Sequence, residues 1–244
     1  MAGGVQWDWV AFFHYLFDQQ ILRGAWTTIW LTALGIASGT VLGSLLMILG
    51  TAESRIPRML YGAYTGIVRG TPLLVQLVLV YNGLPEIGIT LGVVESTLIA
   101  LAFNESAYMA EIIRGGINSV PSGQMEAAKA LGMSRLRAMR VVILPQGIRA
   151  AIPAAGNEVN GLLKSTSLVS VISMTELFRS TQEIYNANFR VLELLIVATL
   201  YYLVMGTGWR FIQNFLEQRL AVSTTVSRVS SRRGRTMAMA RGLW

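Results

Sequence analysis

Five apolar stretches, each about 20 residues long, constrain this chain more than any other feature of its sequence. A helix needs about 20 mostly apolar residues to cross a bilayer core. Only 14% of the residues are charged and 53% are hydrophobic, whereas charge runs near a quarter in soluble domains. We therefore predict an all-α membrane protein with about five transmembrane helices, at residues 25–49, 59–81, 96–113, 151–172 and 194–216.

The start of the chain and its residue counts limit its chemistry. Residues 1–20 lack the basic start of a cleavable signal peptide, so we expect residues 1–24 to persist as an outer or interfacial segment. The chain has no cysteine and a single histidine, His14. These counts exclude thiolate metal sites and disulfides, and His14 in its aromatic segment is expected to be structural. We therefore expect no catalytic residue, metal or cofactor in this chain.

The positions of lysine and arginine predict the orientation of the chain, because basic loops stay in the cytoplasm. Basic residues follow the first apolar stretch, fill the connection between the third and fourth, and occupy the tail. Residues 82–95 hold two glutamates and no base. Five spans with the N-terminus outside and the C-terminus in the cytoplasm place all three basic segments on one side. Topology thus explains the net charge of +7 without a nucleic-acid partner.

Two further features concern packing and the end of the chain. Glycines recur at every fourth position in the first two spans, where small residues let helices approach closely. We expect both rows to pack inside the chain, with a seam between two copies as the alternative. The basic tail at residues 217–244 is expected to be disordered and to lie against anionic lipid. The glycine rows are Gly35, Gly39 and Gly43, then Gly62, Gly66 and Gly70.

The connection at about residues 114–149 carries clear helix signals. Strong helix formers after the turn at residues 121–123 predict a short amphipathic helix over about residues 125–131. Gly132 ends this helix, and Ser134 is a plausible N-cap for a second one. Pro145 then redirects the backbone toward the membrane.

This connection resembles the signature loop of the membrane subunits of binding-protein-dependent ABC importers. The pattern is Glu126-Ala127-Ala128, three residues, Gly132, nine residues, an aliphatic residue, any residue, then Leu144-Pro145. Val142 is a mild departure, because isoleucine is commonest there. Three other motifs resemble the polar amino-acid permease branch, and the resemblance covers nearly all of residues 25–216. They are residues 69–74, residues 107–117, and residues 156–158 with 163–168.

The resemblance implies a type I ABC importer permease fold in the bacterial inner membrane. Its implied partners are two ABC ATPase subunits that bind ATP and magnesium, a second permease subunit, either a copy or a paralogue, and an extracytoplasmic amino-acid-binding protein. In that family the loop helix docks in a cleft of the ATPase, and its small alanines suit a groove. The residues assigned to this docking are Glu126, Ala127, Ala128 and Gly132.

A phosphate-binding loop is excluded in the fourth apolar stretch. Gly156, Gly161, Lys164 and Ser165 suggest that motif, but its lysine and serine must directly follow the second glycine. Two leucines intervene here. ATP hydrolysis must therefore come from a partner.

Ionisable residues at membrane depth cost about 2.5 to 3.5 kcal/mol each, so they usually face a cavity or a partner. Arg69 lies midway along the second span, and Thr71 and Pro72 after it resemble a new helix start, so we predict a break there. A guanidinium binds a carboxylate through forked hydrogen bonds. We assign Arg69 to the α-carboxylate of an amino acid; the alternative is a structural pair with Glu105 or Glu158.

Helical spacing places further polar residues beside Arg69. Asn104 and Tyr108 share one face of the third span, and Glu158 and Ser165 nearly share one in the fourth. Glu111 and Arg114 are spaced for an intrahelical pair, and Lys164 points away from the polar face without a clear role. The predicted substrate-binding residues are Arg69, Gln76, Asn104, Tyr108, Glu158 and Ser165.

The number of acidic groups bears on the substrate. Permeases of this branch that take cationic amino acids tend to carry a second acid at the position that matches Ser165. One carboxylate, Glu158, then remains for the substrate ammonium group. The sequence therefore favours a neutral polar amino acid such as glutamine, followed by arginine or histidine.

The predicted function is that of the transmembrane subunit of an ATP-driven importer for a polar amino acid, with alternating access driven by partner ATPases. A self-sufficient ion-coupled carrier or channel is the alternative. It would need no docking loop, and five spans leave no inverted repeat. An intramembrane hydrolase would need a serine with a histidine, or paired aspartates, within the spans. The predicted spans contain neither combination, so this class is excluded.

Overall fold

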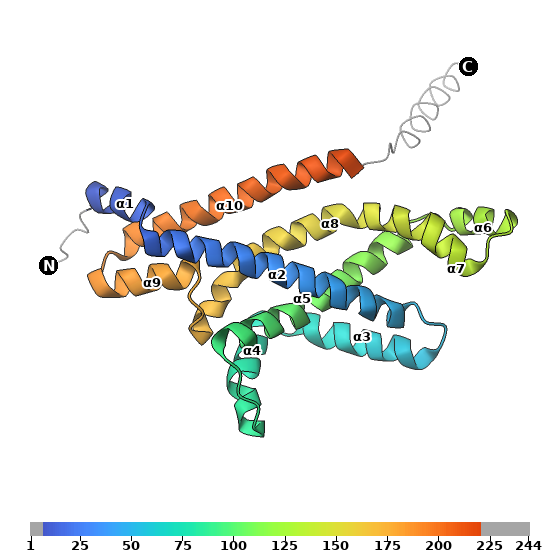
Figure 1. Ribbon diagram of the computed structural model, residues 1–244, viewed down its shortest axis with the longest axis horizontal. Helices are drawn as coiled ribbons and strands as arrows, with labels where there is room; N and C mark the ends of the chain where they lie inside the picture. The colour runs from blue at the N-terminus through green and yellow to red at the C-terminus, as the bar shows by residue number, and fades with distance from the viewer. Residues whose placement is uncertain (1–6, 221–244) are drawn as a thin grey trace, which may run out of the picture.

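The computed structural model describes residues 7–220, and every regular element in this range is helical (Figure 1). The all-α prediction is thus confirmed, while most of the predicted tail, residues 221–244, lies outside the described residues. The helices are α1 (Trp9–Leu16), α2 (Gln19–Gly50), α3 (Arg55–Gly70), α4 (Leu73–Val78), α5 (Val93–Asn118), α6 (Ser122–Ala130), α7 (Arg135–Ala138), α8 (Leu144–Ser165), α9 (Leu177–Asn188) and α10 (Val191–Leu220).

The helices form an elongated bundle with two distinct ends (Figure 1). Helices α2, α5 and α10 run from the end that holds α1 and α9 toward the end that holds α6 and α7, and α3 and α8 return. Short π and 3-10 turns extend two of these helices, α4 and α8. They are η1 (Leu79–Gly83) and η2 (Leu84–Ile87) after α4, η3 (Met139–Ile143) before α8, and η4 (Thr166–Ile172) after α8.

Two of the five predicted spans are both long and apolar enough to cross a membrane. These are α2 and α10, and the bent pair formed by α3 and the segment Leu73–Ile87 makes a third candidate. Helices α5 and α8 have 26 and 22 residues, but they are too polar to qualify by length and composition. Their polar residues include four that were predicted to bind substrate, namely Asn104, Tyr108, Glu158 and Ser165.

The predicted break in the second apolar stretch is present, with a bend of 100° between its two parts. Its local chemistry differs from the prediction by one residue. The Thr71 hydroxyl donates to the carbonyl of Ile67 at 2.9 Å, so it closes α3 and does not cap α4. Pro72 is the N-cap of α4, and Leu73 is its first residue.

The first glycine row brings α2 into direct backbone contact with α5. A Cβ on Gly39 would lie 2.4 Å from the Glu105 Cβ, and one on Gly43 would lie 2.7 Å from the Ser106 carbonyl oxygen. The prediction that the glycines pack inside the chain is thus confirmed for this row. The same prediction is wrong for the second row, because within residues 7–220 a Cβ on Gly62, Gly66 or Gly70 would meet no atom within 4 Å.

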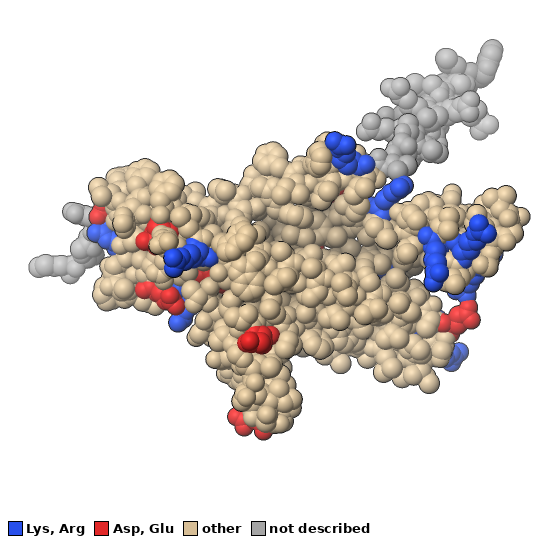
Figure 2. Space-filling model, viewed as in Figure 1, with Lys and Arg blue, Asp and Glu red and all other residues tan. Residues whose placement is uncertain are grey.

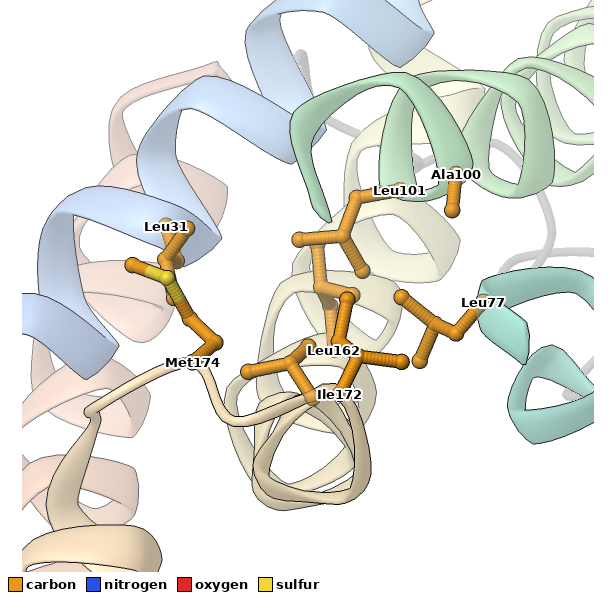
Figure 3. Packing of buried hydrophobic residues seen from close by; sticks show 8 residues of the cluster. Leu31, Leu77, Ala100, Leu101, Leu162, Ile172 and Met174 are labelled. Atoms are coloured by element: carbon orange, nitrogen blue, oxygen red, sulfur yellow. The ribbon is translucent and has the colours of Figure 1, made fainter. Parts of the chain in front are cut away.

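Two apolar clusters hold the bundle together. The first joins α2, α4, α5 and α8; in Figure 3, Leu101 and Leu162 lie near the centre of the view, between Leu31 on one side and Leu77 on the other. The second joins α1, α2, α9 and α10 at the opposite end from α6. The first cluster lies directly beside the helix break and so fixes the position of α4.

Hydrogen bonds and an ion pair stabilise the end that holds α1 and α9. The carboxylate of Glu176 is fully buried, caps α9, and accepts hydrogen bonds from the Tyr202 hydroxyl at 3.0 Å and the Thr28 hydroxyl at 3.4 Å. Asp8 caps α1 and pairs with Arg190 at 2.6 Å. A backbone N–H of α1 and the Arg190 guanidinium hold the pKa of Asp8 below its ordinary value.

The connection between α5 and α8 largely follows its prediction. Helix α6 begins three residues earlier than expected, Gly132 ends it with a φ of +77°, and the Ser134 side chain caps α7. Pro145 differs from expectation, because it lies in the first turn of α8 and the helical path reaches it without a break. The backbone therefore enters α8 through the π turn at Met139–Ile143.

The substitution Gly39→Ala should destabilise the chain by about 1 to 3 kcal/mol, because an added methyl group overlaps α5. Gly66→Ala is the matched control, since it changes the same residue type in a helix interior that has free space. Thermal unfolding of the purified chain in detergent measures both. Equal effects at the two positions would contradict the close α2–α5 contact.

Candidate functional site

A cavity of about 360 Å³ lies at the helix break, between the end of α3, α5 and α8. Its walls include five of the six predicted substrate-binding residues, so the structure brings together side chains that are up to 96 positions apart in the sequence (165 − 69 = 96). The lining residues are Arg69, Gly70, Thr71, Pro72, Leu73, Asn104, Glu105, Tyr108, Glu158, Gly161, Leu162 and Ser165.

Arg69 supplies the positive charge of this cavity. Its side chain is 45% exposed, and its Nη1 lies 3.7 Å from an oxygen of Glu111. The guanidinium carbon lies 5.3 Å from the centre of the Tyr108 ring, which suits a cation–π contact. The predicted alternative partners were wrong, because the structural partner is Glu111 and not Glu105 or Glu158.

Glu111 is held more closely by other groups than by Arg69. Arg114 donates to it at 2.6 and 3.0 Å, which confirms the predicted intrahelical pair, and the Tyr61 hydroxyl donates at 2.6 Å. The longer and partly solvated contact with Arg69 is therefore the weakest bond of this carboxylate. The Arg69 guanidinium keeps donors that can bind another carboxylate.

Two carboxylates line this cavity together with Arg69. Glu158 was predicted to line it, whereas Glu105 was mentioned only as a pairing partner. Glu105 is 2% exposed, and within residues 7–220 its Oε2 atom has no hydrogen-bond partner. A buried carboxylate oxygen without a donor is costly, so it favours a ligand that brings one. The premise of a single acidic group was therefore wrong.

Gln76 has a different position from the one predicted. Its amide nitrogen donates to the Val68 carbonyl at 2.8 Å and to the Thr71 hydroxyl at 2.9 Å, while its amide oxygen accepts from Asn104 at 3.0 Å. These bonds satisfy backbone groups that the break leaves free. Gln76 therefore connects the two halves of the bent helix and orients Asn104, which does line the cavity.

A second cavity, of about 530 Å³, continues from the first toward the end that holds α6. The two share Arg69, Tyr108 and Glu158, and the second extends to Ser119 and Ala150. Beyond it, α5 and α8 touch through glycines, because a Cβ on Gly116 would lie 2.3 Å from the Gly147 carbonyl oxygen. The polar cavity is thus connected to the α6 end along one side of α5.

The residues predicted to dock with an ATPase lie at that end. Glu126, Ala127 and Gly132 are exposed, whereas Ala128 is 3% exposed and packs against its own chain. Ala128 is therefore not available to a groove on a partner. Arg135 forms an ion pair with Glu53, which ties α7 to the α2–α3 connection.

Replacement of Gln76 by methionine should lower the free energy of unfolding by about 1 to 3 kcal/mol without any substrate present, because it removes hydrogen bonds from the partly buried Val68 carbonyl and from the buried Asn104 amide. Thermal unfolding of the purified chain measures this, with Ser165→Ala as a control in the cavity wall. If Gln76→Met left the stability unchanged but abolished substrate binding, Gln76 would be a substrate contact instead.

Comparisons with known proteins agree with this geometry. Residues 35–222 match the family described as "binding-protein-dependent transport system inner membrane component". The chain is 39% identical to the arginine transport system permease protein ArgU of Corynebacterium glutamicum, covering 90% of this chain and 74% of that protein. It is 34% identical to the glutamine transport system permease protein GlnP of Escherichia coli, covering 89% and 100%.

Solved structures of ABC transporters also resemble this chain. An amino acid ABC transporter crystallised with histidines has a TM-score of 0.83 and 36% identity, covering 88% of this chain and 99% of that one. An inward-facing methionine ABC transporter, MetNI, has a TM-score of 0.70 at 19% identity, covering 83% and 97%, and shows a shared fold. The family match spans most of the chain and both relatives exceed 30% identity. This chain therefore belongs to the inner membrane components of binding-protein-dependent transport systems.

Proposed function

We propose that this chain is the transmembrane subunit of an ATP-driven importer for a polar amino acid. The observation that carries the proposal is the cavity at the helix break, which holds one guanidinium and two carboxylates at a depth where charges are costly. Family membership and the amino-acid substrates named for its relatives support this reading. The type I importer fold of the structural neighbours is consistent with it.

The cavity suits an amino acid through complementary charge. Arg69 would bind the α-carboxylate with its free donors, and Glu158 would accept from the α-ammonium group. Glu105 then remains for a second positive group, since it lines the same cavity and one of its carboxylate oxygens has no hydrogen-bond partner within residues 7–220. We therefore favour a cationic amino acid such as arginine over the neutral one that the sequence favoured.

The distribution of charge supports the proposed orientation. Lysine and arginine gather at the end that holds α6 and α7, and the opposite end is mixed in sign (Figure 2). Basic segments stay in the cytoplasm, so α6 would face inward and α1 and α9 outward, with five membrane crossings. Two partner ATPases would contact Glu126 and Ala127, a second permease subunit would complete the pathway, and an extracytoplasmic binding protein would deliver substrate.

The connected cavities suggest how ATP hydrolysis acts on the substrate. Both are bounded by α5 and α8; α8 continues from α7 through η3 without a break, and the short turn at Gly132 joins α7 to α6. Movement of α6 by an ATPase would shift α8, and with it Glu158, relative to Arg69. A self-sufficient carrier would not need the exposed Glu126 and Ala127 at the far end of this path, so the importer is favoured.

Arginine should bind the permease–ATPase complex more tightly than glutamine, because only arginine can pair with both carboxylates. Glu105→Gln should weaken arginine binding about tenfold or more, and glutamine binding much less. Equilibrium dialysis of labelled amino acids, with the binding protein left out, measures the site in this chain alone. Glu95→Gln, on the exposed start of α5, is the matched control. Tighter glutamine binding, or equal losses for both ligands, would contradict a cationic substrate.

Gly132→Val should uncouple ATP hydrolysis from uptake, because a φ of +77° costs a side chain about 1 to 2 kcal/mol and would redirect the exit of α6. Reconstituted vesicles with ATPase and binding protein report both rates, and membrane insertion should stay intact. Gly123→Val is the control in the same connection, since an added Cβ has free space there. Glu126→Lys should give the same loss as Gly132→Val. Normal coupled uptake in both of these variants would remove the docking assignment.

A further inference from the structure

A larger groove lies beside the two polar cavities and shares Ile112 and Ala151 with the second of them. It has a volume of about 860 Å³ and runs between α2, α5, α8 and α10. Its lining is almost entirely apolar, with residues such as Ile48, Ile113, Ile152 and Trp209. Among the residues that line it, Arg140 is the only one with an ionisable side chain, and the predicted function uses none of them.

The groove occupies one half of the bundle. Its walls come from residues 36–51 of α2, 109–117 of α5, 136–159 from α7 to α8, and 209–216 of α10. These segments lie toward the end that holds α6 and α7 (Figure 1). In the proposed orientation, on which this inference rests, this half lies in the cytoplasmic leaflet.

Two of the helices that border the groove, α2 and α10, bury little of their most apolar segments within the chain. Only 17% of the most apolar window of α2 and 22% of that of α10 is buried within the chain. A recess between two such helices is open to the hydrocarbon of the bilayer, and an apolar wall there is suited to acyl chains. The Trp209 indole N–H donates to the Gly156 carbonyl at 2.7 Å, so its polar atom is already satisfied.

The charge at the edge of the groove indicates which kind of lipid headgroup it would attract. Arg140 is exposed, and within residues 7–220 it forms no ion pair or hydrogen bond. The groove lining contains no aspartate or glutamate. A lone guanidinium at the cytoplasmic edge of an apolar groove attracts an anionic lipid headgroup. We propose that the groove binds an anionic phospholipid of the cytoplasmic leaflet, with its acyl chains along the groove and its phosphate on Arg140.

The position of this lipid would connect it to the coupling connection. Leu136 and Met139, which line the groove, lie between α6 and α8. An acyl chain that packs against them would brace the path by which α6 moves α8. The lipid would thus belong to the working form of the transporter and would not only solvate it.

Trp209 provides a direct test, because brominated acyl chains quench a tryptophan that they touch. The full-length chain in mild detergent is titrated with dibromo-phosphatidylglycerol or with dibromo-phosphatidylcholine of the same chain length. The difference between the wild type and Trp209→Phe isolates the signal from the groove. We expect the anionic lipid to quench this signal at about fivefold lower concentration, the preference that one surface cation provides.

Arg140→Gln should abolish this preference, and Arg149→Gln should keep it. Arg149, nine residues further along the chain, is also exposed, and it does not line the groove. Equal quenching by both lipids in the wild type, or the same loss in both variants, would overturn the proposal. Absence of quenching by either lipid would also overturn it, since the groove would then be covered by protein, such as a second copy of this chain.

Failure of this inference can be told apart from failure of the proposed function. Amino-acid uptake is measured in vesicles with the partner ATPase and binding protein. Uptake without groove quenching would reject the lipid site and keep the transport function. Quenching with the expected preference but without uptake would support the lipid site and reject the transport function.

Discussion

The contact between α2 and α5 is the constraint on which the rest of the structure depends. Helices in lipid gain little from the hydrophobic effect when they associate, so close packing must supply the attraction. Gly39 and Gly43 let the two backbones touch, and the contact presses directly on Glu105. A larger residue at Gly39 would push α5 away and move Glu105 from its place in the cavity wall.

Polar and charged groups gather at three places along the bundle, its two ends and its centre. The end that holds α1 and α9 is fixed by buried Glu176, the centre holds the charged cavity, and the end that holds α6 carries exposed Glu126 and Ala127. Helix α8 lines the cavity and continues without a break from α7, which follows α6 after a short turn, and Gly147 keeps α8 against α5. A transporter needs rigid elements that link two sites, because these elements convert movement at one end into a rearrangement at the centre.

Much of this arrangement could be predicted from the sequence where local rules apply. Long apolar runs gave α2 and α10, and the residues Gly132 and Ser134 marked helix ends correctly. Five of the six predicted substrate residues line one cavity, because helical spacing holds within each straight segment.

The errors arise where tertiary structure overrides those rules. A bend of 100° after Gly70 takes Gln76 out of the wall of the cavity that Arg69 lines, so Gln76 bonds across the break instead. Glu105 was not predicted to line the cavity. Its position there depends on how α5 packs against α2, and the spacing of residues within α5 carries no such information. The second glycine row and Ala128 were misjudged for the same reason, since only the packed chain shows which small residues have neighbours.

The most direct test asks whether α6 faces the cytoplasm and meets an ATPase there. The chain has no cysteine, so Ala127→Cys and Ala187→Cys place one reporter on an exposed alanine of α6 and one of α9. In spheroplasts, a membrane-impermeant maleimide should label Ala187→Cys alone. In inside-out vesicles it should label Ala127→Cys, and added ATPase subunits should protect that site. Labelling of Ala127→Cys from the outside, or no protection by the ATPase, would contradict a cytoplasmic coupling helix.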